Sequence, residues 1–233
     1  MLVLLPGMDG TGALFDPFIS SLGKGCKVQI VRYPANVFLS YSQLEQHVLS
    51  DLPEGVPITL VAESFSGPIA LRISQRGDLN LQAIILVCSF ASRPFGWLGT
   101  LLARLPLRYL LRFRLPAIVS RMLLLGASAS QELISATALA ISSVQASVLA
   151  ARLREALTST YCHGQIEPRT RIILLFSNRD RLLGRRGVRS ILKICTEVES
   201  HVINAPHLAL QSTPGEIAQL LIRLGVLDQS GCA

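Results

Sequence analysis

The sequence lacks the cysteine spacings that hold metal ions or staple small secreted domains. Its five cysteines include no C-x-x-C pair, and neither Cys88 nor Cys195 has a histidine or an acid at a useful spacing. Both lie in apolar segments and are expected to be small buried residues. The odd number of cysteines and the absence of a signal-peptide pattern favour a reducing cytoplasm. We therefore expect no metal site, no cysteine-based catalysis and no cofactor.

Charge is also scarce, because charged side chains make up only 16% of the 233 residues while 50% are apolar. This composition excludes a disordered chain and suits one large α/β domain with a sizeable core. Acidic side chains are fewer than basic ones, and the resulting net charge of +7 favours acidic partners or substrates. The longest run without charge, 133–151, contains Ser, Thr and Gln. We interpret it as a buried helix rather than a membrane span.

Nucleotide-binding signatures are missing as well. The loop from Pro6 to Gly12 holds three glycines in six residues, but it lacks a Gly-Lys-Ser/Thr ending and has no dinucleotide-binding spacing. Such a loop indicates backbone with positive φ or a close approach to another group. No recognisable nucleic-acid-binding module accompanies the basic residues, so we expect no nucleic-acid partner.

Short apolar segments recur along the chain, separated by helical segments of about ten to fifteen residues. This alternation predicts βαβ units and a mostly parallel six-stranded sheet with helices on both faces. A last helix is expected at Thr213-Pro214, where Glu216 completes a capping-box pattern. The expected strands are 2–5, 28–31, 58–61, 81–87, 171–176 and 198–203.

The alternation stops after Cys88. Residues 92–168 carry no strand signal and are rich in Leu, Ala, Ser and Arg, which predicts several helices. We predict that 92–168 form a helical lid inserted into a core of residues 1–91 and 169–228. The helices should be broken at Pro94, Pro106, Pro116 and Gly126.

This insert holds eight arginines and three glutamates. Arg104, Arg108 and Arg112 recur every four residues, which places them on one helix face if Pro106 permits a continuous helix. They form either a solvated surface or a docking site for an acidic partner. An acidic carrier protein and an anionic lipid surface are the candidates.

Ser64 lies between a strand-like and a helix-like segment, so the backbone must turn sharply at this residue. Such a turn lifts a serine hydroxyl clear of the sheet, and the following helix N-terminus supplies N–H groups and partial positive charge. Ala62 and Ser66 occupy the small positions where the G-x-S-x-G pattern has glycine. The alternative is an idle serine between a buried strand and a helix.

Asp180 and His207 also follow predicted strands. Because the carboxyl ends of parallel strands meet at one edge of the sheet, we expect both side chains near Ser64 and the glycine loop. The alternatives are a histidine satisfied within its own loop and a surface ion pair of Asp180 with Arg179 or Arg181.

The sequence resembles α/β-hydrolases over nearly its whole length, through the loop 6–10, the turns at Ser64 and Asp180, and Pro206-His207. Most relatives carry His-Gly where this chain has Pro6-Gly7, and the first two antiparallel strands of the larger fold are missing. The resemblance implies Ser64 as nucleophile, His207 as general base, Asp180 as its orienter, and the backbone N–H groups of Met8 and Phe65 as the oxyanion hole. Asp9 adjoins that hole, where an ionised carboxylate would oppose catalysis. We expect its side chain to turn away and bond N–H groups of its own loop.

The resemblance implies a serine hydrolase that cleaves carboxylic esters of hydrophobic or acyl substrates through an acyl-enzyme. A thioesterase or acyltransferase uses the same residues, including on carrier-bound acyl chains, and the sequence is similar to pimeloyl-ACP methyl ester esterases. A C–C hydrolase or a haloperoxidase is also possible on this scaffold. The alternative from another class is a non-catalytic, hydrolase-like binding protein, although such proteins typically lose a triad member and this chain has all three.

Overall fold

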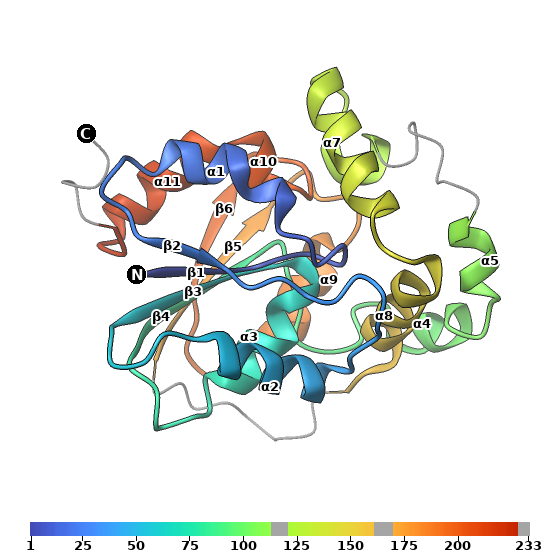
Figure 1. Cartoon of the computed structure of the whole chain (residues 1–233), viewed down its shortest axis with the longest axis horizontal. Coiled ribbons are helices and arrows are strands. Elements are labelled where there is room, and N and C mark those ends of the chain that lie inside the picture. The colour runs from blue at the N-terminus through green and yellow to red at the C-terminus, as the bar shows by residue number, and fades with distance from the viewer. Residues whose placement is uncertain (113–120, 161–169, 228–233) are drawn as a thin grey trace.

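Six strands form one sheet in which every neighbouring pair is parallel, in the order β2-β1-β3-β4-β5-β6 (Figure 1). The computed structural model describes residues 1–112, 121–160 and 170–227. The predicted six-stranded parallel sheet is confirmed, with each strand end within two residues of its expected place. The strands are β1 (Leu2–Leu5), β2 (Val28–Ile30), β3 (Ile58–Glu63), β4 (Leu81–Val87), β5 (Arg171–Ser177) and β6 (Glu199–Ile203).

Both faces of the sheet are covered, which is why its inner strands are continuous apolar runs instead of alternating ones. Every residue of β1 and β3 is buried. Alternate residues of β1 point into two separate cores: Val3 and Leu5 into one, Leu2 and Leu4 into the other. The first core is closed by α2 (Tyr41–Asp51), α3 (Gly67–Ile73) and α9 (Gly184–Leu192), and the second by α1 (Asp16–Ser21), α10 (Ala209–Ser212) and α11 (Pro214–Arg223).

The last helix begins at Pro214 as predicted, but the predicted capping box is wrong. The Thr213 side chain does not cap the helix; its hydroxyl instead donates to the carbonyl of Ala209 at 3.1 Å. The reason is that α10 runs directly into this turn, so Thr213 still belongs to the hydrogen bonding of the preceding helix.

The insert contains no strand within residues 92–112 and 121–160. Helix breaks occur at Pro106 and Gly126 as predicted, and Pro116 lies outside the described residues. The elements are α4 (Gly96–Leu102), α5 (Leu107–Arg112), a short π-helix η3 (Arg121–Leu125), α7 (Gln131–Ser142) and α8 (Ala146–Thr158).

The prediction of a single buried helix over 133–151 is wrong. The run is split between α7 and α8, which are bent by 96° relative to each other. The Gln145 N–H donates to the carbonyl of Ala35 at 3.0 Å instead of continuing the helix, so a contact with the core makes the break. Within the described residues no single helix is long and apolar enough to cross a membrane, and only this bent pair reaches the required length and composition.

A common face for Arg104 and Arg108 required a continuous helix across Pro106, and this condition is not met. Helix α4 ends at Leu102 and α5 begins at Leu107, because Pro106 lacks an N–H and cannot continue a helix. Arg104 lies in the turn, and the Arg108 guanidinium stacks on the ring of Tyr109 at 4.5 Å. The side chain of Arg112 lies outside the described part of the structure.

The insert packs on the core at the edge where the strands end. Leu125 of η3 and Ile134 of α7 form a small apolar cluster with Leu14 and Leu208 of the core. In addition, the Leu208 N–H donates to the carbonyl of Leu124 at 2.9 Å. The insert therefore contacts the core at Leu208, the residue directly after His207.

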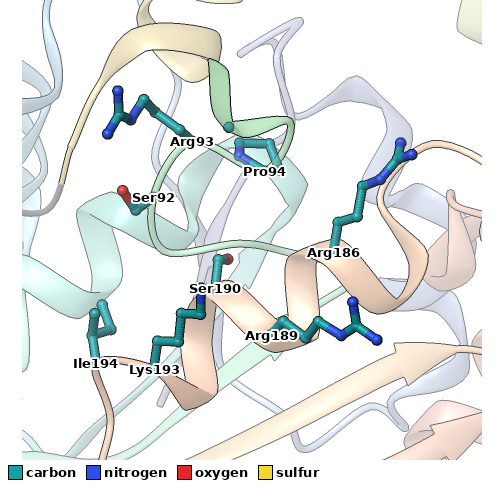
Figure 2. A pocket seen from close by; sticks show the side chains of 9 residues that line it. Ser92, Arg93, Pro94, Arg186, Arg189, Ser190, Lys193 and Ile194 are labelled. Atoms are coloured by element: carbon teal, nitrogen blue, oxygen red, sulfur yellow. The ribbon is translucent and has the colours of Figure 1, made fainter. Parts of the chain in front are cut away.

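A cavity of about 410 Å³ lies between α9 and the segment leading into α4 (Figure 2). Neither Ser64, Asp180 nor His207 lines it. The lining residues are Ser92, Arg93, Pro94, Gly96, Arg186, Arg189, Ser190, Lys193 and Ile194.

Candidate active site

Ser64 occupies a tight turn between β3 and α3 and has a φ of 48°, a left-handed conformation that non-glycine residues seldom adopt. Backbone strain of this kind concentrates at functional sites. The turn is held from behind, since the hydroxyl of Ser89 donates to the carbonyl of Ser64 at 2.5 Å. A Cβ on Gly67 would lie only 2.0 Å from that same hydroxyl, so α3 needs glycine at its first position.

Ser66 stands where the usual pattern has glycine, and the structure gives a reason. Its hydroxyl is fully buried, donates to the carbonyl of Pro6, and lies 2.6 Å from the hydroxyl of Tyr33. The side chain thus ties the turn at Ser64 to the loop after β1. A glycine at this position would remove that connection.

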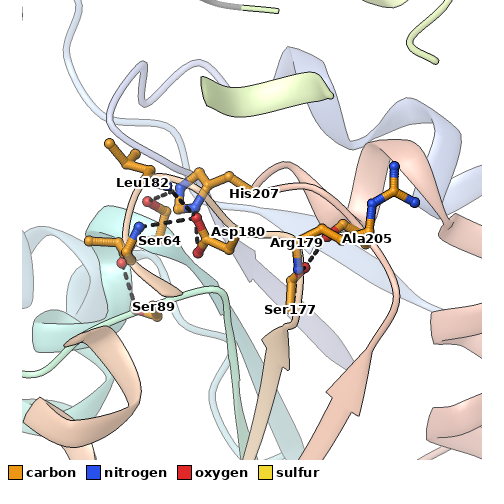
Figure 3. A network of polar contacts seen from close by, with 9 residues as sticks. Ser64, Ser89, Ser177, Arg179, Asp180, Leu182, Ala205 and His207 are labelled. Atoms are coloured by element: carbon orange, nitrogen blue, oxygen red, sulfur yellow. Dashed lines mark hydrogen bonds and ion pairs between the residues drawn. The ribbon is translucent and has the colours of Figure 1, made fainter. Parts of the chain in front are cut away.

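The three predicted side chains meet in a continuous hydrogen-bonded chain (Figure 3). Ser64 Oγ lies 2.8 Å from His207 Nε2, and His207 Nδ1 lies 2.9 Å from Asp180 Oδ2. The side chains of His207 and Asp180 are each 2% exposed, whereas Ser64 is partly open to solvent. A base beside a hydroxyl, and an acid beside the base, is the arrangement that activates a serine.

Asp180 does not pair with its arginine neighbours. Its other oxygen, Oδ1, accepts from the N–H groups of Leu182 at 2.8 Å and Leu183 at 3.0 Å. Burial opposes its ionisation, but the hydrogen bond and the charge of His207, with those two N–H groups, outweigh burial and lower the pKa of this carboxyl. The carboxylate is therefore ionised at neutral pH.

The turns that carry Asp180 and His207 are joined below the site. The buried hydroxyl of Ser177, the last residue of β5, donates to the carbonyl of Ala205 and accepts from the N–H of Arg179 at 3.0 Å (Figure 3). This bridge fixes the two turns relative to each other, which keeps the distance from His207 to Asp180 short.

Asp9 turns into its own loop, as expected from the sequence. Its Oδ2 accepts from the N–H of Thr11 at 2.9 Å and from the Thr11 hydroxyl at 2.5 Å. The N–H of the preceding residue, Met8, has no hydrogen-bond acceptor among the described residues. It is left available for a ligand.

Solved structures of other proteins share this architecture. A hydrolase from Oleispira antarctica is 19% identical, with a TM-score of 0.76 over 96% of this chain and 89% of that one. A thermophilic esterase from Thermogutta terrifontis is 16% identical, with a TM-score of 0.75 over 96% and 88%. An alpha/beta hydrolase fold protein from Chitinophaga pinensis is 14% identical, with a TM-score of 0.73 over 98% and 89%. The chain has the α/β-hydrolase fold. Neither the protein-family models nor the curated proteins gave a match.

Sequence reasoning missed Arg152, which is buried beneath the candidate site of this α/β-hydrolase fold. It lies on α8 of the insert and is 1% exposed. Its Nη1 donates to the carbonyls of Met8 at 2.9 Å and Asp9 at 2.8 Å, and its Nη2 donates to that of Pro34 at 2.8 Å. The only sequence signal was its place in an apolar stretch, because its partners lie more than a hundred residues away.

Glu63, directly before Ser64, was also missed. It is 2% exposed, and its Oε2 accepts from Gln211 Nε2 at 3.3 Å. Burial and then the nearby charge of Asp9 raise the pKa of Glu63 to about 8, while the Gln211 hydrogen bond acts in the opposite direction. Glu63 is therefore mostly neutral at pH 7, which spares the site a second negative charge next to Asp9.

No group of three or more His, Cys, Asp or Glu side chains in the described ranges is placed to hold a metal ion. Cys88 and Cys195 are buried free thiols, as expected. Burial raises the pKa of both thiols, that of Cys195 to about 12, so neither is poised as a thiolate nucleophile.

Proposed function

We propose that this protein is a serine hydrolase that cleaves carboxylic esters of hydrophobic or acyl substrates. The observation that carries the proposal is the chain of hydrogen bonds from Ser64 through His207 to the buried Asp180. The fold it shares with solved hydrolases and esterases adds support. A non-catalytic binding protein has no need for a strained serine in contact with a buried, oriented histidine.

In the proposed reaction, Ser64 Oγ attacks the ester carbonyl as His207 Nε2 takes its proton. Asp180 holds the Nδ1–H of the ring and stabilises the imidazolium that forms. The tetrahedral intermediate collapses as the imidazolium protonates the leaving alcohol. A water molecule, deprotonated by the same nitrogen, then hydrolyses the acyl-enzyme and restores Ser64.

The N–H groups of Met8 and Phe65 are the proposed oxyanion hole. That of Phe65 lies in the first turn of the helical segment after β3, where backbone N–H groups have no intrahelical acceptor. The position of the Met8 N–H is set by the loop after β1, and Arg152 holds this loop by donating to the carbonyls of Met8 and Asp9. Arg152 is thus a proposed positioning residue, acting through the loop without touching the substrate.

We propose that the insert, residues 92–168, acts as a lid whose apolar residues receive the acyl group. Its contacts with Leu208, beside His207, support this placement. Arg152 links the same insert to the loop after β1. A shift of the lid would therefore reach the oxyanion hole directly.

Replacing Arg152 with Gln should lower kcat about 100-fold, the cost typical of a lost oxyanion donor, with a much smaller change in KM. Arg154→Gln, two residues further along α8, should stay within about twofold, because among the described residues its side chain bonds only the Ala103 carbonyl in the insert. Circular dichroism and thermal unfolding would establish that both variants fold. A folded Arg152→Gln protein with unchanged kcat, or with loss confined to KM, contradicts the positioning role.

The substrate class is tested with p-nitrophenyl esters from acetate to palmitate, acyl-coenzyme A thioesters of matched length, and a fluorophosphonate probe. We expect ester hydrolysis with a single chain-length optimum, and labelling of Ser64 located by peptide mass spectrometry. Labelling with turnover of thioesters alone would replace the ester assignment with a thioesterase. Absence of both labelling and turnover would favour the binding-protein alternative.

A further inference from the structure

Helix α4 exposes an apolar face that nothing in the described residues covers. Trp97 is 73% exposed and Leu101 53%. Leu98 and Leu102 are exposed beside them, and these four positions fall on one side of the helix. Gly99 lies on the opposite side and packs against Leu157 of α8, so the helix is fixed with its apolar side outward.

This cluster differs from the other exposed apolar side chains. Leu139 on α7 and Val202 on β6 are each the single exposed large apolar residue of their element, and η3 exposes only the pair Met122 and Leu123. On α4 four large apolar residues adjoin, and Leu105 and Tyr109 extend the exposed surface towards α5. A contiguous apolar patch of this kind usually marks a site of interaction.

Positive charge lies beside the start of α4, and the sequence segments that form this region carry no acid. Residues 92–131 contain six arginines and no Asp or Glu, and 181–196 contain no acid either. Arg186 and Arg189 of α9, with Lys193 directly after the helix, line the cavity that Gly96, the first residue of α4, also lines (Figure 2). Arg186 lies over the ring of Phe95 at 5.3 Å, which joins the basic side of α9 to the start of α4.

We propose that this face, formed by α4 with the cavity beside α9, docks on the surface of an anionic phospholipid bilayer. Trp and Leu side chains enter the boundary between headgroups and acyl chains, while guanidinium and ammonium groups meet lipid phosphates at headgroup depth. Tryptophan is favoured at that interface. The cavity is large enough and basic enough to receive a phosphate headgroup.

The alternatives fit less well. A second copy would bring two basic rims together, and like charges at an interface are costly. An acidic protein needs a surface shaped to a protruding helix, whereas a fluid bilayer adapts to one. The helix is far too short to span the membrane, so the association is peripheral. The inference does not depend on the proposed catalytic activity.

Trp97 is the only tryptophan of the chain, so its fluorescence reports directly on this face. The experiment titrates the intact protein with phosphatidylcholine vesicles and with vesicles that contain one quarter phosphatidylglycerol. We expect a blue shift and at least tenfold tighter binding to the anionic vesicles, weakened by salt, because each nearby basic residue contributes about fivefold. Vesicle flotation measures the same partition without using fluorescence.

Two double variants test the two parts of the surface by flotation. Leu98→Gln with Leu101→Gln should reduce binding at least tenfold, whereas Leu139→Gln, on the separate helix α7, should leave it unchanged. Arg186→Glu with Arg189→Glu should abolish the preference for anionic vesicles. Arg223→Glu, at the last residue of α11, should have little effect, because α11 and α4 lie on opposite sides of the molecule in Figure 1.

Any of three results would overturn the proposal. The first is no binding to anionic vesicles by the folded wild type. The second is equal loss in the matched control variants. The third is a Trp97 blue shift that arises from self-association in analytical ultracentrifugation, or that soluble polyglutamate reproduces, because the face would then bind a second copy or an acidic protein.

Discussion

Changing Ser64 to alanine should reduce kcat/KM for the best p-nitrophenyl ester by a factor of about 10⁴ or more. The change removes the only oxygen within hydrogen-bonding distance of His207 Nε2 among the described residues. Without it, hydrolysis requires direct attack by water, for which the remaining groups supply only modest catalysis. The fluorophosphonate probe should also fail to label the variant.

The fold should survive this change. The left-handed backbone at this position strains serine and alanine to a similar extent, because both carry a Cβ. The Ser89 contact is made to the backbone of residue 64 and is retained. We therefore expect thermal unfolding within a few degrees of the wild type. Ser50→Ala, on the exposed side of α2, is the matched control and should keep full activity. A Ser64→Ala protein that retains a tenth of the activity would mean that the nucleophile is elsewhere.

The sheet and the meeting of Ser64, Asp180 and His207 were predictable from the sequence for a physical reason. Strands buried on both faces are continuous apolar runs, and parallel strands bring the residues that follow them to one edge. Three residues far apart in the chain could thus be placed together from strand ends alone. Their catalytic roles come from the resemblance and remain proposals.

What the sequence did not reveal depends on contacts between distant segments. The break between α7 and α8 has no proline or glycine to announce it, and follows from the Gln145 contact with Ala35. Arg152 counted as one more charge of a basic insert, yet it is buried against the loop that holds Met8. The break between Arg104 and Arg108 was different, because Pro106 was a visible signal.

The second large effect is expected for Asp180→Asn, which should reduce kcat about 10⁴-fold although it changes one atom. The hydrogen bonds of the Asp180 carboxylate explain this large loss. Oδ1 accepts from two backbone N–H groups, so an asparagine places its carbonyl oxygen there and its NH₂ group towards His207. That NH₂ donates to Nδ1, which forces the ring proton onto Nε2. The imidazole can then no longer accept the proton of Ser64.

Asp180→Asn should also change the tautomer of His207. In the wild type the Nδ1–H tautomer of His207 should dominate at pH 8, and in Asp180→Asn the Nε2–H tautomer should replace it, as read by nitrogen-15 shifts of the ring. Asp180→Ala leaves the tautomer free, so it should be at least as active as the isosteric asparagine variant. Asp51→Asn, at the exposed end of α2, should behave as the wild type. A full-rate Asp180→Asn protein, or one with an unchanged tautomer, would remove Asp180 from the proposed mechanism and leave it a structural acid of the turn after β5.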